Sequence, residues 1–302
     1  FEGEWRAVKG SRYFESYDLY KENGFKERKK AEELIQYLQT PDDESVNVAG
    51  IQEQSGLNCR IESIEKKKEK KNPPLLYNLA ELQNDCSKRF KISPDETLRI
   101  VQELYEKKLV TYPRTDARVL STAVAKEITR NLNGLSKYPM AAPYMQDILN
   151  FGSYKTLAKT RYVNDKQITD HYAIIPTGQG LNALNTVSST AKGVYDLIVR
   201  RFLSIFYPPA VYQKVAIVTK IKEESFFSSF KVLAEEGYLK VAGIPKKKAP
   251  QTATKDGSNG NNDNNNNNDT NDEAGSDSSE QSLDTGLFEV IKSLKKGAVL
   301  LV

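Results

Sequence analysis

The chain is 302 residues long, with 38% hydrophobic and 28% charged residues and a formal net charge of +4, which is typical of a soluble globular protein of one large domain or two ordinary ones. No apolar run approaches the roughly 18 residues of a transmembrane helix, and the two cysteines, Cys59 and Cys86, form no CxxC pair. These features argue against a membrane-spanning protein, a disulfide-built scaffold and a zinc site.

Residues 1–72 are expected to form β structure around one helix. The stretch EWRAV begins an extended segment, and KERKKAEELIQYLQT places apolar residues at helical spacing: Ala31, Leu34, Ile35 and Leu38. The stretch from Val46 to Lys70 then returns to β-branched residues. The closely spaced lysines at its end predict a solvated strand end, with a phosphate-binding patch as the alternative: Lys66, Lys67, Lys68, Lys70 and Lys71.

Residues 73–207 are predicted to be mainly helical, after a break at Pro73 and Pro74. Apolar residues first recur at helical spacing: Leu75, Leu79, Leu82, Cys86 and Phe90. A second helix is then predicted to start at Ser93, which forms a capping box with Glu96, with Pro94 at the first helical position. The apolar face of this helix would be formed by Leu98, Val101, Leu104 and Tyr105. Ser121 is the expected cap of a third helix, and the long amphipathic stretch TAKGVYDLIVRRFLSIFY stops at Pro208.

Residues 208–302 return to strand character, because VYQKVAIVTKI and SSFKVLAEEGYLKVAG alternate apolar and polar residues. The Asn/Asp-rich stretch at about 249–283 is predicted to be disordered, since it has nothing to bury. The stretch LFEVIKSLKKGAVLLV is expected to add a last strand or two. The predicted fold class is therefore multidomain α+β, in which a mainly helical domain, 73–207, is inserted into a β-rich domain formed by 1–72 and 208–302. Two chain crossings would join the domains, which suits a movable arm.

The charge is unevenly distributed. Residues 251–284 contain eight acidic residues and one base, Lys255, so the rest of the chain is more basic than its net charge of +4 suggests. A basic folded body with an acidic tract attached favours a polyanionic partner.

The stretch LVTYPRTDARVLS, residues 109–121, gathers groups that can act on a phosphate. The phenol of Tyr112 can serve as a covalent nucleophile toward phosphorus. Arg114 lies two residues further on, so on an extended chain both side chains share one face, where a guanidinium can bind a phosphate and stabilise a pentavalent transition state. Asp116 can orient Arg114, and Thr115 can donate a hydrogen bond. The alternative is a Tyr-Pro edge followed by an ordinary surface pair of Arg and Asp.

A second stretch, NDKQITDHYAIIPT, residues 164–177, contains His171, the only histidine of the chain. His171 can donate to a phosphate or carry a proton, and a packed or surface position is the alternative. The sequence has no GxSxG, P-loop, HExxH or GxGxxG motif. A nucleotide-driven motor is therefore not encoded in this chain, and no serine hydrolase motif accompanies the histidine.

Together these stretches resemble type IA DNA topoisomerases, closest to the topoisomerase III branch. The resemblance also covers NPPLLYNLAELQNDCSKRFKISPDETLRIVQELYE, EGYLKVAG and SLKKGAVLLV. It implies that Tyr112 cleaves one DNA strand through a 5′-phosphotyrosyl bond, that Arg114 positions Tyr112 and the scissile phosphate, and that His171 contacts the phosphate. Tyr172 stands where the family usually has a second histidine, and Ala117 where serine is common. The expected supporting and DNA-binding residues are Thr115, Asp116, Arg118, Lys166, Arg200 and Arg201.

The resemblance also implies Mg²⁺ for the whole enzyme, held by an acidic toprim domain that has no counterpart in this chain, so the fragment itself is expected to bind no metal. The chain opens without Met, and we expect it to be a fragment covering the hinge domain and a winged-helix-like domain that carries the tyrosine. Alone, it should not relax DNA. The implied reaction is ATP-independent cleavage, strand passage and religation. The expected partner is single-stranded DNA, bound by a monomer without nucleotide or membrane, in the bacterial cytoplasm at the nucleoid.

Two other classes remain open. A noncatalytic DNA-binding module would use the same arginines and lysines to bind phosphates without chemistry. A tyrosine recombinase would also cleave DNA, but that class needs several Arg and His residues and a tyrosine near its C-terminus, which this chain lacks.

Overall fold

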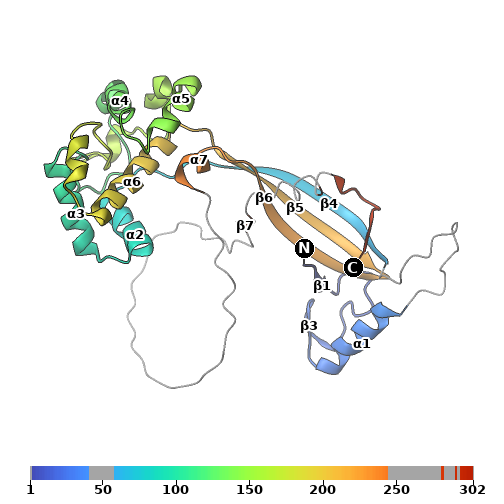
Figure 1. Ribbon diagram of the computed structural model, residues 1–302. Helices are drawn as coiled ribbons and strands as arrows, with labels where there is room; N and C mark the ends of the chain where they lie inside the picture. Colours follow the sequence, from blue (N-terminus) through green and yellow to red (C-terminus); the bar gives the residue numbers. More distant parts are fainter. Residues whose placement is uncertain (1, 41–57, 244–279, 282–289, 291–292, 302) are drawn as a thin grey trace, which may run out of the picture. The chain divides into compact units, whose positions relative to one another are not determined.

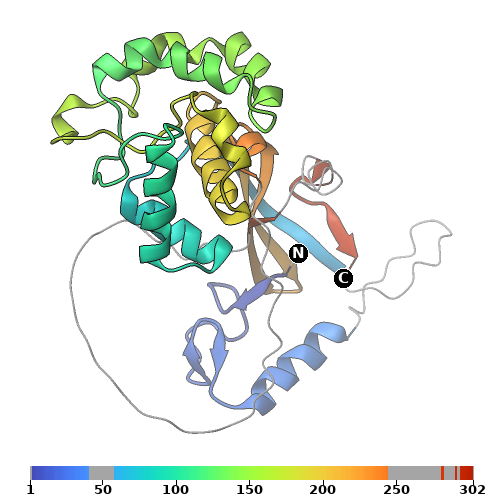
Figure 2. The same ribbon diagram turned by 60° about the vertical axis from the view of Figure 1, so that its left-hand side comes forward.

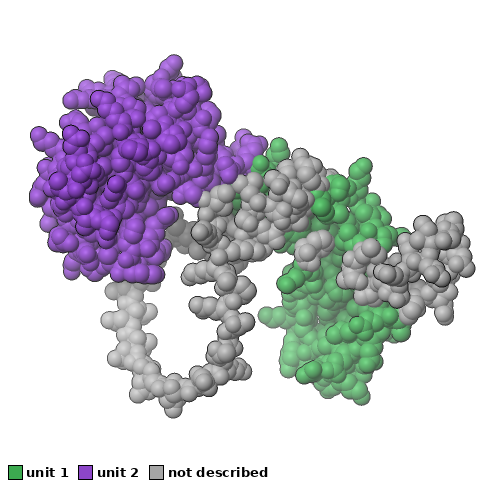
Figure 3. Space-filling model, in the orientation of Figure 1, with its two compact units in different colours: residues 1–69, 212–234, 245–302 green, residues 70–211, 235–244 purple. Residues whose placement is uncertain are grey.

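The computed structural model describes residues 2–40, 58–243, 280–281, 290 and 293–301. The chain divides into two compact units (Figure 3). Unit 1 comprises residues 1–69, 212–234 and 245–302, and unit 2 comprises 70–211 and 235–244. Most of the predicted disordered stretch, about 249–283, lies outside the described residues, as does the stretch 46–57.

Unit 1 is built on a six-stranded sheet with the order β1-β6-β5-β4-β8, and β7 pairs with β6 (Figure 1). The strands are β1 (Glu4–Arg6), β4 (Asn58–Lys71), β5 (Ala210–Ile221), β6 (Glu224–Glu235), β7 (Glu280–Gln281) and β8 (Val299–Leu301). β1 pairs antiparallel with β6 and β8 antiparallel with β4, whereas β7 runs parallel to β6. β7 falls inside the stretch that was predicted to be disordered.

The core of unit 1 is formed by side chains of this sheet and of one helix, α1 (Arg28–Gln39). One cluster joins three strands through Ile61, Val215, Ile217, Phe230 and Val232, and a second joins α1 to the sheet through Leu34, Leu38, Cys59 and Ile221. Ile35, expected on the buried face of α1, is exposed. The lysines at the end of β4 are exposed, as the solvated strand end predicts.

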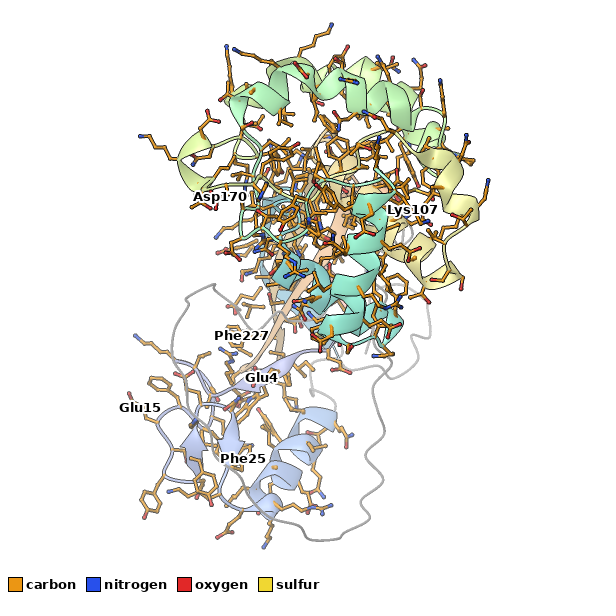
Figure 4. The ribbon with its side chains drawn as sticks, turned by 90° about the vertical axis from the view of Figure 1, so that its left-hand side faces the viewer. Glu4, Glu15, Phe25, Lys107, Asp170 and Phe227 are labelled. Carbon is orange, nitrogen blue, oxygen red and sulfur yellow. The ribbon has the colours of Figure 1, made fainter. Side chains whose placement is uncertain are left out.

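The N-terminal segment folds back against the β5–β6 hairpin. Glu4 pairs with Phe227 across β1 and β6, and both are labelled in Figure 4. A small hairpin of β2 (Leu19–Lys21) and β3 (Gly24–Phe25) follows, and Trp5 stacks on Phe25 with ring centroids 4.9 Å apart. The buried carboxylate of Glu224 accepts hydrogen bonds from the Trp5 indole at 2.7 Å and from the hydroxyl of Ser11 at 2.6 Å.

Unit 2 is mainly helical. Its helices are α2 (Leu79–Phe90), α3 (Pro94–Glu106), α4 (Thr122–Leu135), α5 (Ala142–Phe151), α6 (Ser189–Ser204) and α7 (Leu239–Ala242), with 3₁₀ turns η1 (Ser153–Lys159), η2 (Asp165–Gln167) and η3 (Leu181–Asn185). Figure 2 shows α6 between the α2–α3 pair and the α4–α5 pair. The predicted caps are confirmed, because Ser93 accepts from the Glu96 amide and Ser121 from the Val124 amide.

Two predicted elements of unit 2 differ from the structure. Leu75 was expected on the first helix, but α2 begins after Asn78, whose side chain accepts from the Glu81 amide, and residues 72–78 are not helical. The stretch EGYLKVAG was expected to be a strand, but β6 ends at Glu235 and α7 follows. The turn at Gly237 has φ +50 and approaches the Pro209 carbonyl so closely that a side chain there would clash. α7 is consequently folded back onto α6.

The predicted α+β fold class is confirmed, while the winged-helix character of the helical part stays a prediction. The predicted inserted domain, 73–207, compares with 70–211 in unit 2, which also takes residues 235–244 from the stretch that was assigned to the β-rich domain. Among the described residues, no helix has both the length and the apolar character needed to cross a bilayer.

Candidate active site

A tight turn at Lys108 joins the end of α3 to the tyrosine motif, residues 109–121. Lys108 has a left-handed backbone with φ 60. Its amide donates to the Tyr105 carbonyl at 2.8 Å, and the Leu109 amide donates to the Leu104 carbonyl at 2.9 Å. These two bonds form a Schellman motif, which ends a helix and redirects the chain. Leu104 and Leu109 are both fully buried and anchor the turn.

The two sequence motifs lie side by side along a set of backbone contacts. Val110 forms an antiparallel bridge with Pro176, and the Thr111 amide donates to the Ile175 carbonyl at 3.0 Å. The hydroxyl of Thr111 donates to the Ala173 carbonyl and accepts from the Ile175 amide, each at 3.0 Å. The stretch before Tyr112 and the stretch after His171 are thereby held in fixed register.

Thr115 ties the tyrosine motif to the histidine. Its buried hydroxyl donates to the His171 carbonyl at 2.8 Å and accepts from the Ala117 amide at 3.1 Å. Its carbonyl accepts from the Leu79 amide at 3.1 Å, at the first residue of α2. The supporting role expected for Thr115 stays a prediction, and this contact gives that prediction a physical basis.

Two aromatic rings contact Tyr112. The ring centroids of Tyr112 and His171 are 4.2 Å apart with planes tilted by 37°. Tyr105, on α3, meets Tyr112 edge-on at 5.5 Å and 86°. Tyr112 is half-buried and His171 is exposed. The phenol ring of Tyr112 therefore packs against one residue of α3, Tyr105, and against His171 of the second motif. The imidazole of His171 remains open to a ligand.

A pocket of about 280 Å³ lies at this point of unit 2. It is lined by Tyr105, Lys108, Val110, Thr111, Tyr112, His171, Tyr172, Thr177 and Gln179. Figure 4 draws the side chains of this unit and labels Lys107 and Asp170, the chain neighbours of Lys108 and His171. Burial raises the pKa of Tyr172 above its usual range, so its phenol stays neutral and can donate a hydrogen bond.

Arg114 and Asp116 are both exposed, on either side of the buried Thr115. Within the described residues neither side chain forms an ion pair or a hydrogen bond with another side chain, so the structure shows no orientation of Arg114 by Asp116. The guanidinium of Arg114 is consequently open to an external anion, two residues from the phenol of Tyr112.

Arg118 and Lys166 occupy different environments. The Arg118 guanidinium forms an ion pair with Glu81 at 3.4 Å and donates to the Leu76 carbonyl, also at 3.4 Å, which ties it to the start of α2. Lys166 is exposed on η2 and does not line the pocket. The supporting roles predicted for these two residues stay predictions.

Arg200 and Arg201 point into unit 2. Arg200 donates to the Val241 carbonyl at 2.7 Å and so fastens α7 to α6. Arg201, with a side chain only 14% exposed, forms an ion pair with Asp85 at 2.9 Å and lies over the Tyr77 ring at 4.2 Å. The Tyr77 hydroxyl donates to Asp85 at 2.5 Å and accepts from Arg201 at 3.1 Å. The prediction that these arginines bind DNA gains no support from these contacts.

Sequence reasoning missed several pocket residues. Tyr105 was assigned to the apolar face of α3, yet it is 39% exposed and contacts Tyr112. Lys108 and Gln179 were not singled out at all. One feature of the sequence could have indicated Tyr105 and Lys108: both lie just before the tyrosine motif, at the predicted end of a helix. The last side chains of a helix that ends there are expected to lie close to the motif.

No group of three His, Cys, Asp or Glu side chains lies together in the way that a metal site needs, within the ranges that the structure describes.

Comparison with known proteins identifies the family. A family model described as DNA topoisomerase matches residues 4–283, and the chain therefore belongs to the DNA topoisomerase family. DNA topoisomerase 3 of Bacillus subtilis (strain 168) is 35% identical over 202 residues, which cover 67% of this chain and 27% of the relative. DNA topoisomerase 3 of Bacillus licheniformis is 38% identical over 182 residues, 60% of this chain and 24% of the relative. The chain is thus a type IA, topoisomerase III-like member of the family.

The chain spans about a quarter of the length of these relatives, whose covered shares are 27% and 24%. Among solved structures, full-length topoisomerase I from Thermotoga maritima is similar, with a TM-score of 0.49 and 20% identity over 76% of this chain and 34% of that chain.

Proposed function

We propose that this chain carries the nucleophile of a type IA DNA topoisomerase and that Tyr112 is the residue that cleaves DNA. The observation that carries the proposal is the position of Tyr112 at a pocket, with its ring centroid 4.2 Å from that of His171, two residues from an exposed Arg114 that has no side-chain partner among the described residues. Membership of the DNA topoisomerase family supports it, because family members act on DNA.

In the proposed reaction, the phenolic oxygen of Tyr112 attacks a phosphorus atom of one DNA strand. A bond forms between that oxygen and phosphorus, and the bond from phosphorus to the 3′ oxygen of the neighbouring nucleotide breaks. The proton lost by the phenol is balanced by the proton that the leaving 3′ oxygen gains. One phosphodiester replaces another, so resealing by the free 3′ hydroxyl needs no nucleotide.

Two side chains are proposed to assist. Arg114 binds the non-bridging phosphate oxygens with its planar guanidinium and stabilises the charge of the transition state. His171 donates an N–H to the same phosphate from its place beside the Tyr112 ring. A neutral phenol is a weak nucleophile, and two donor groups at the phosphate lower the barrier by stabilising the negative charge that develops there in the transition state.

For the whole protein we propose single-stranded DNA as the bound substrate, strand passage through the break and religation as the outcome, and a monomer without nucleotide cofactor as the working form. Mg²⁺ is proposed for that whole protein as well. This chain is proposed to lack relaxation activity when isolated.

The test is Tyr112→Phe in the full-length protein. We expect loss of the covalent adduct with an end-labelled single-stranded oligonucleotide and loss of plasmid relaxation, while binding to the same oligonucleotide is kept. The matched control is Tyr20→Phe, which removes an exposed phenol from unit 1 and should change neither readout. If Tyr112→Phe still formed the covalent adduct with DNA at the normal rate, the proposal would be wrong. Binding without any adduct in the unmodified protein would favour the noncatalytic module.

A further inference from the structure

Lys108 occupies a backbone position that normally suits glycine. Its φ of 60 is left-handed, at the residue that follows the C-cap Lys107 of α3, where a side chain is sterically disfavoured and glycine is the common choice. The surrounding structure fixes this conformation from both sides, because the Lys108 amide donates to the Tyr105 carbonyl and its carbonyl accepts from the Thr177 hydroxyl at 2.5 Å. Lysine thus stands at a strained backbone position, and of the left-handed lysines Lys91, Lys108 and Lys222 it is Lys108 that lines the pocket.

The charge of Lys108 has no partner in the part of the chain that the structure describes. Its neighbour Lys107, in contrast, forms an ion pair with Glu103 at 3.9 Å and donates to the Thr186 hydroxyl at 3.5 Å. Among the described residues, the pocket lining includes no Asp or Glu, and its side chains that can carry positive charge are those of Lys108 and His171. A pocket with one free ammonium and no carboxylate favours an anion.

We propose that Lys108 binds a backbone phosphate of the DNA strand, next to the phosphate that Tyr112 attacks. Lysine suits this task because its ammonium is a compact charge on a flexible stem, which follows a phosphate without demanding one fixed geometry. The location of the phosphate rests on the proposed function, since it places the cleaved strand in the Tyr112 pocket. The contact itself needs only that the pocket receives DNA.

The test compares two lysines that share one backbone conformation. Lys91 also has a left-handed φ, 59, at the end of α2, and it is exposed but does not line the pocket. Lys108→Gly and Lys91→Gly therefore remove the same charge and relieve the same backbone strain, in the same unit. Neither change should lower the melting temperature, because glycine is the favoured residue at both positions.

Binding is measured on the full-length protein in a Tyr112→Phe background, which separates binding from cleavage. The probe is a fluorescent single-stranded oligodeoxynucleotide, titrated at several salt concentrations between about 50 and about 200 mM. We expect Lys108→Gly to weaken binding roughly three- to fivefold, the effect of about one exposed ion pair. The slope of log affinity against log salt should become shallower by about 0.7, the value for one phosphate on a single strand. Lys91→Gly should leave both quantities unchanged, and Lys108→Arg should preserve the slope.

Equal affinity and equal slope for Lys108→Gly and Lys91→Gly would overturn the inference. Cleavage assays with Tyr112 restored locate the phosphate: Lys108→Gly should raise the DNA concentration that gives half-maximal cleavage and leave the rate at saturation unchanged. If Tyr112→Phe itself still cleaves, the proposed function fails, and a shallower salt slope for Lys108→Gly would then still show a DNA contact. The two failures are therefore distinguishable.

Discussion

Unit 2 contains two sets of tyrosine, arginine and aspartate that are chemically alike and placed in opposite ways. In the inner set, Tyr77, Arg201 and Asp85 contact one another, and the Tyr77 ring is almost fully buried. In the outer set, Tyr112 lies half-buried at the pocket, and Arg114 and Asp116 are exposed without side-chain partners in the described structure.

The difference shows that burial and pairing, rather than residue type, decide what such a set can do. Burial, partly offset by the Arg201 charge, raises the pKa of Tyr77 far above its usual range, so its phenol cannot ionise and serves as a hydrogen-bonding group. The guanidinium of Arg201 donates to the Leu75 carbonyl, the Tyr77 hydroxyl and the Asp85 carboxylate, whereas that of Arg114 has no side-chain partner among the described residues and can meet a phosphate. The inner set stabilises unit 2, and the outer set is left available for chemistry.

The largest expected effect on stability is that of Arg201→Ala. Removing this guanidinium leaves the Asp85 carboxylate without its ion-pair partner and removes the group that covers the Tyr77 ring. We expect a loss of about 3 kcal/mol in the free energy of unfolding, the range found when one partner of a largely buried pair is removed. The measurement is urea unfolding followed by far-UV circular dichroism.

The control is Arg114→Ala, the same substitution in the outer set. Its effect on stability should stay within about 0.5 kcal/mol, because an exposed side chain without partners is lost. DNA cleavage, in contrast, should fall strongly for Arg114→Ala. If Arg114→Ala destabilised the protein as much as Arg201→Ala does, the distinction between the two sets would be wrong.

A smaller effect is expected for Tyr77→Phe. This change removes a hydroxyl that donates to Asp85 and accepts from Arg201, while the ion pair between those two residues remains. We expect a loss of about 1–2 kcal/mol, the usual consequence of removing a hydrogen bond to buried charged groups. The same urea experiment on Tyr112→Phe should show a change of less than about 0.5 kcal/mol. Equal losses for the two variants would mean that Tyr112 is a structural residue like Tyr77.

Much of the fold could be predicted from local sequence signals. The caps at Ser93 and Ser121 are determined by a few neighbouring residues, and the structure forms both. The α7 segment was missed because Tyr238, Leu239 and Val241 give no helical period over so short a length. Its conformation follows from the turn at Gly237 and from packing against α6, which are tertiary contacts.

The candidate site was only partly accessible to sequence reasoning. The motifs indicated Tyr112 and His171, and the structure brings their rings together. The pairing of Arg201 with Asp85 could not be predicted, because it joins residues 116 positions apart in the chain. An exposed DNA-binding arginine and a buried one have the same local sequence signature. The left-handed backbone of Lys108 could not be predicted from the sequence either, since lysine does not favour that conformation.

The smallest expected effect concerns the pH dependence of the region around the inner set. Burial raises the pKa of the Cys86 thiol, next to Asp85 on α2, from 9.0 to about 11. The folded protein therefore holds this proton more tightly than the unfolded chain, so the stabilisation is complete below pH 9.0 and is lost as pH rises toward about 11. At about pH 10 the loss should be about 1 kcal/mol relative to pH 8. The Cys86→Ala variant lacks this thiol. Between pH 8 and pH 10 its free energy of unfolding should therefore fall by about 1 kcal/mol less than that of the unmodified protein. Urea unfolding of both proteins at the two pH values measures the difference. If the two proteins showed the same pH dependence, burial would not raise the pKa of the Cys86 thiol as expected.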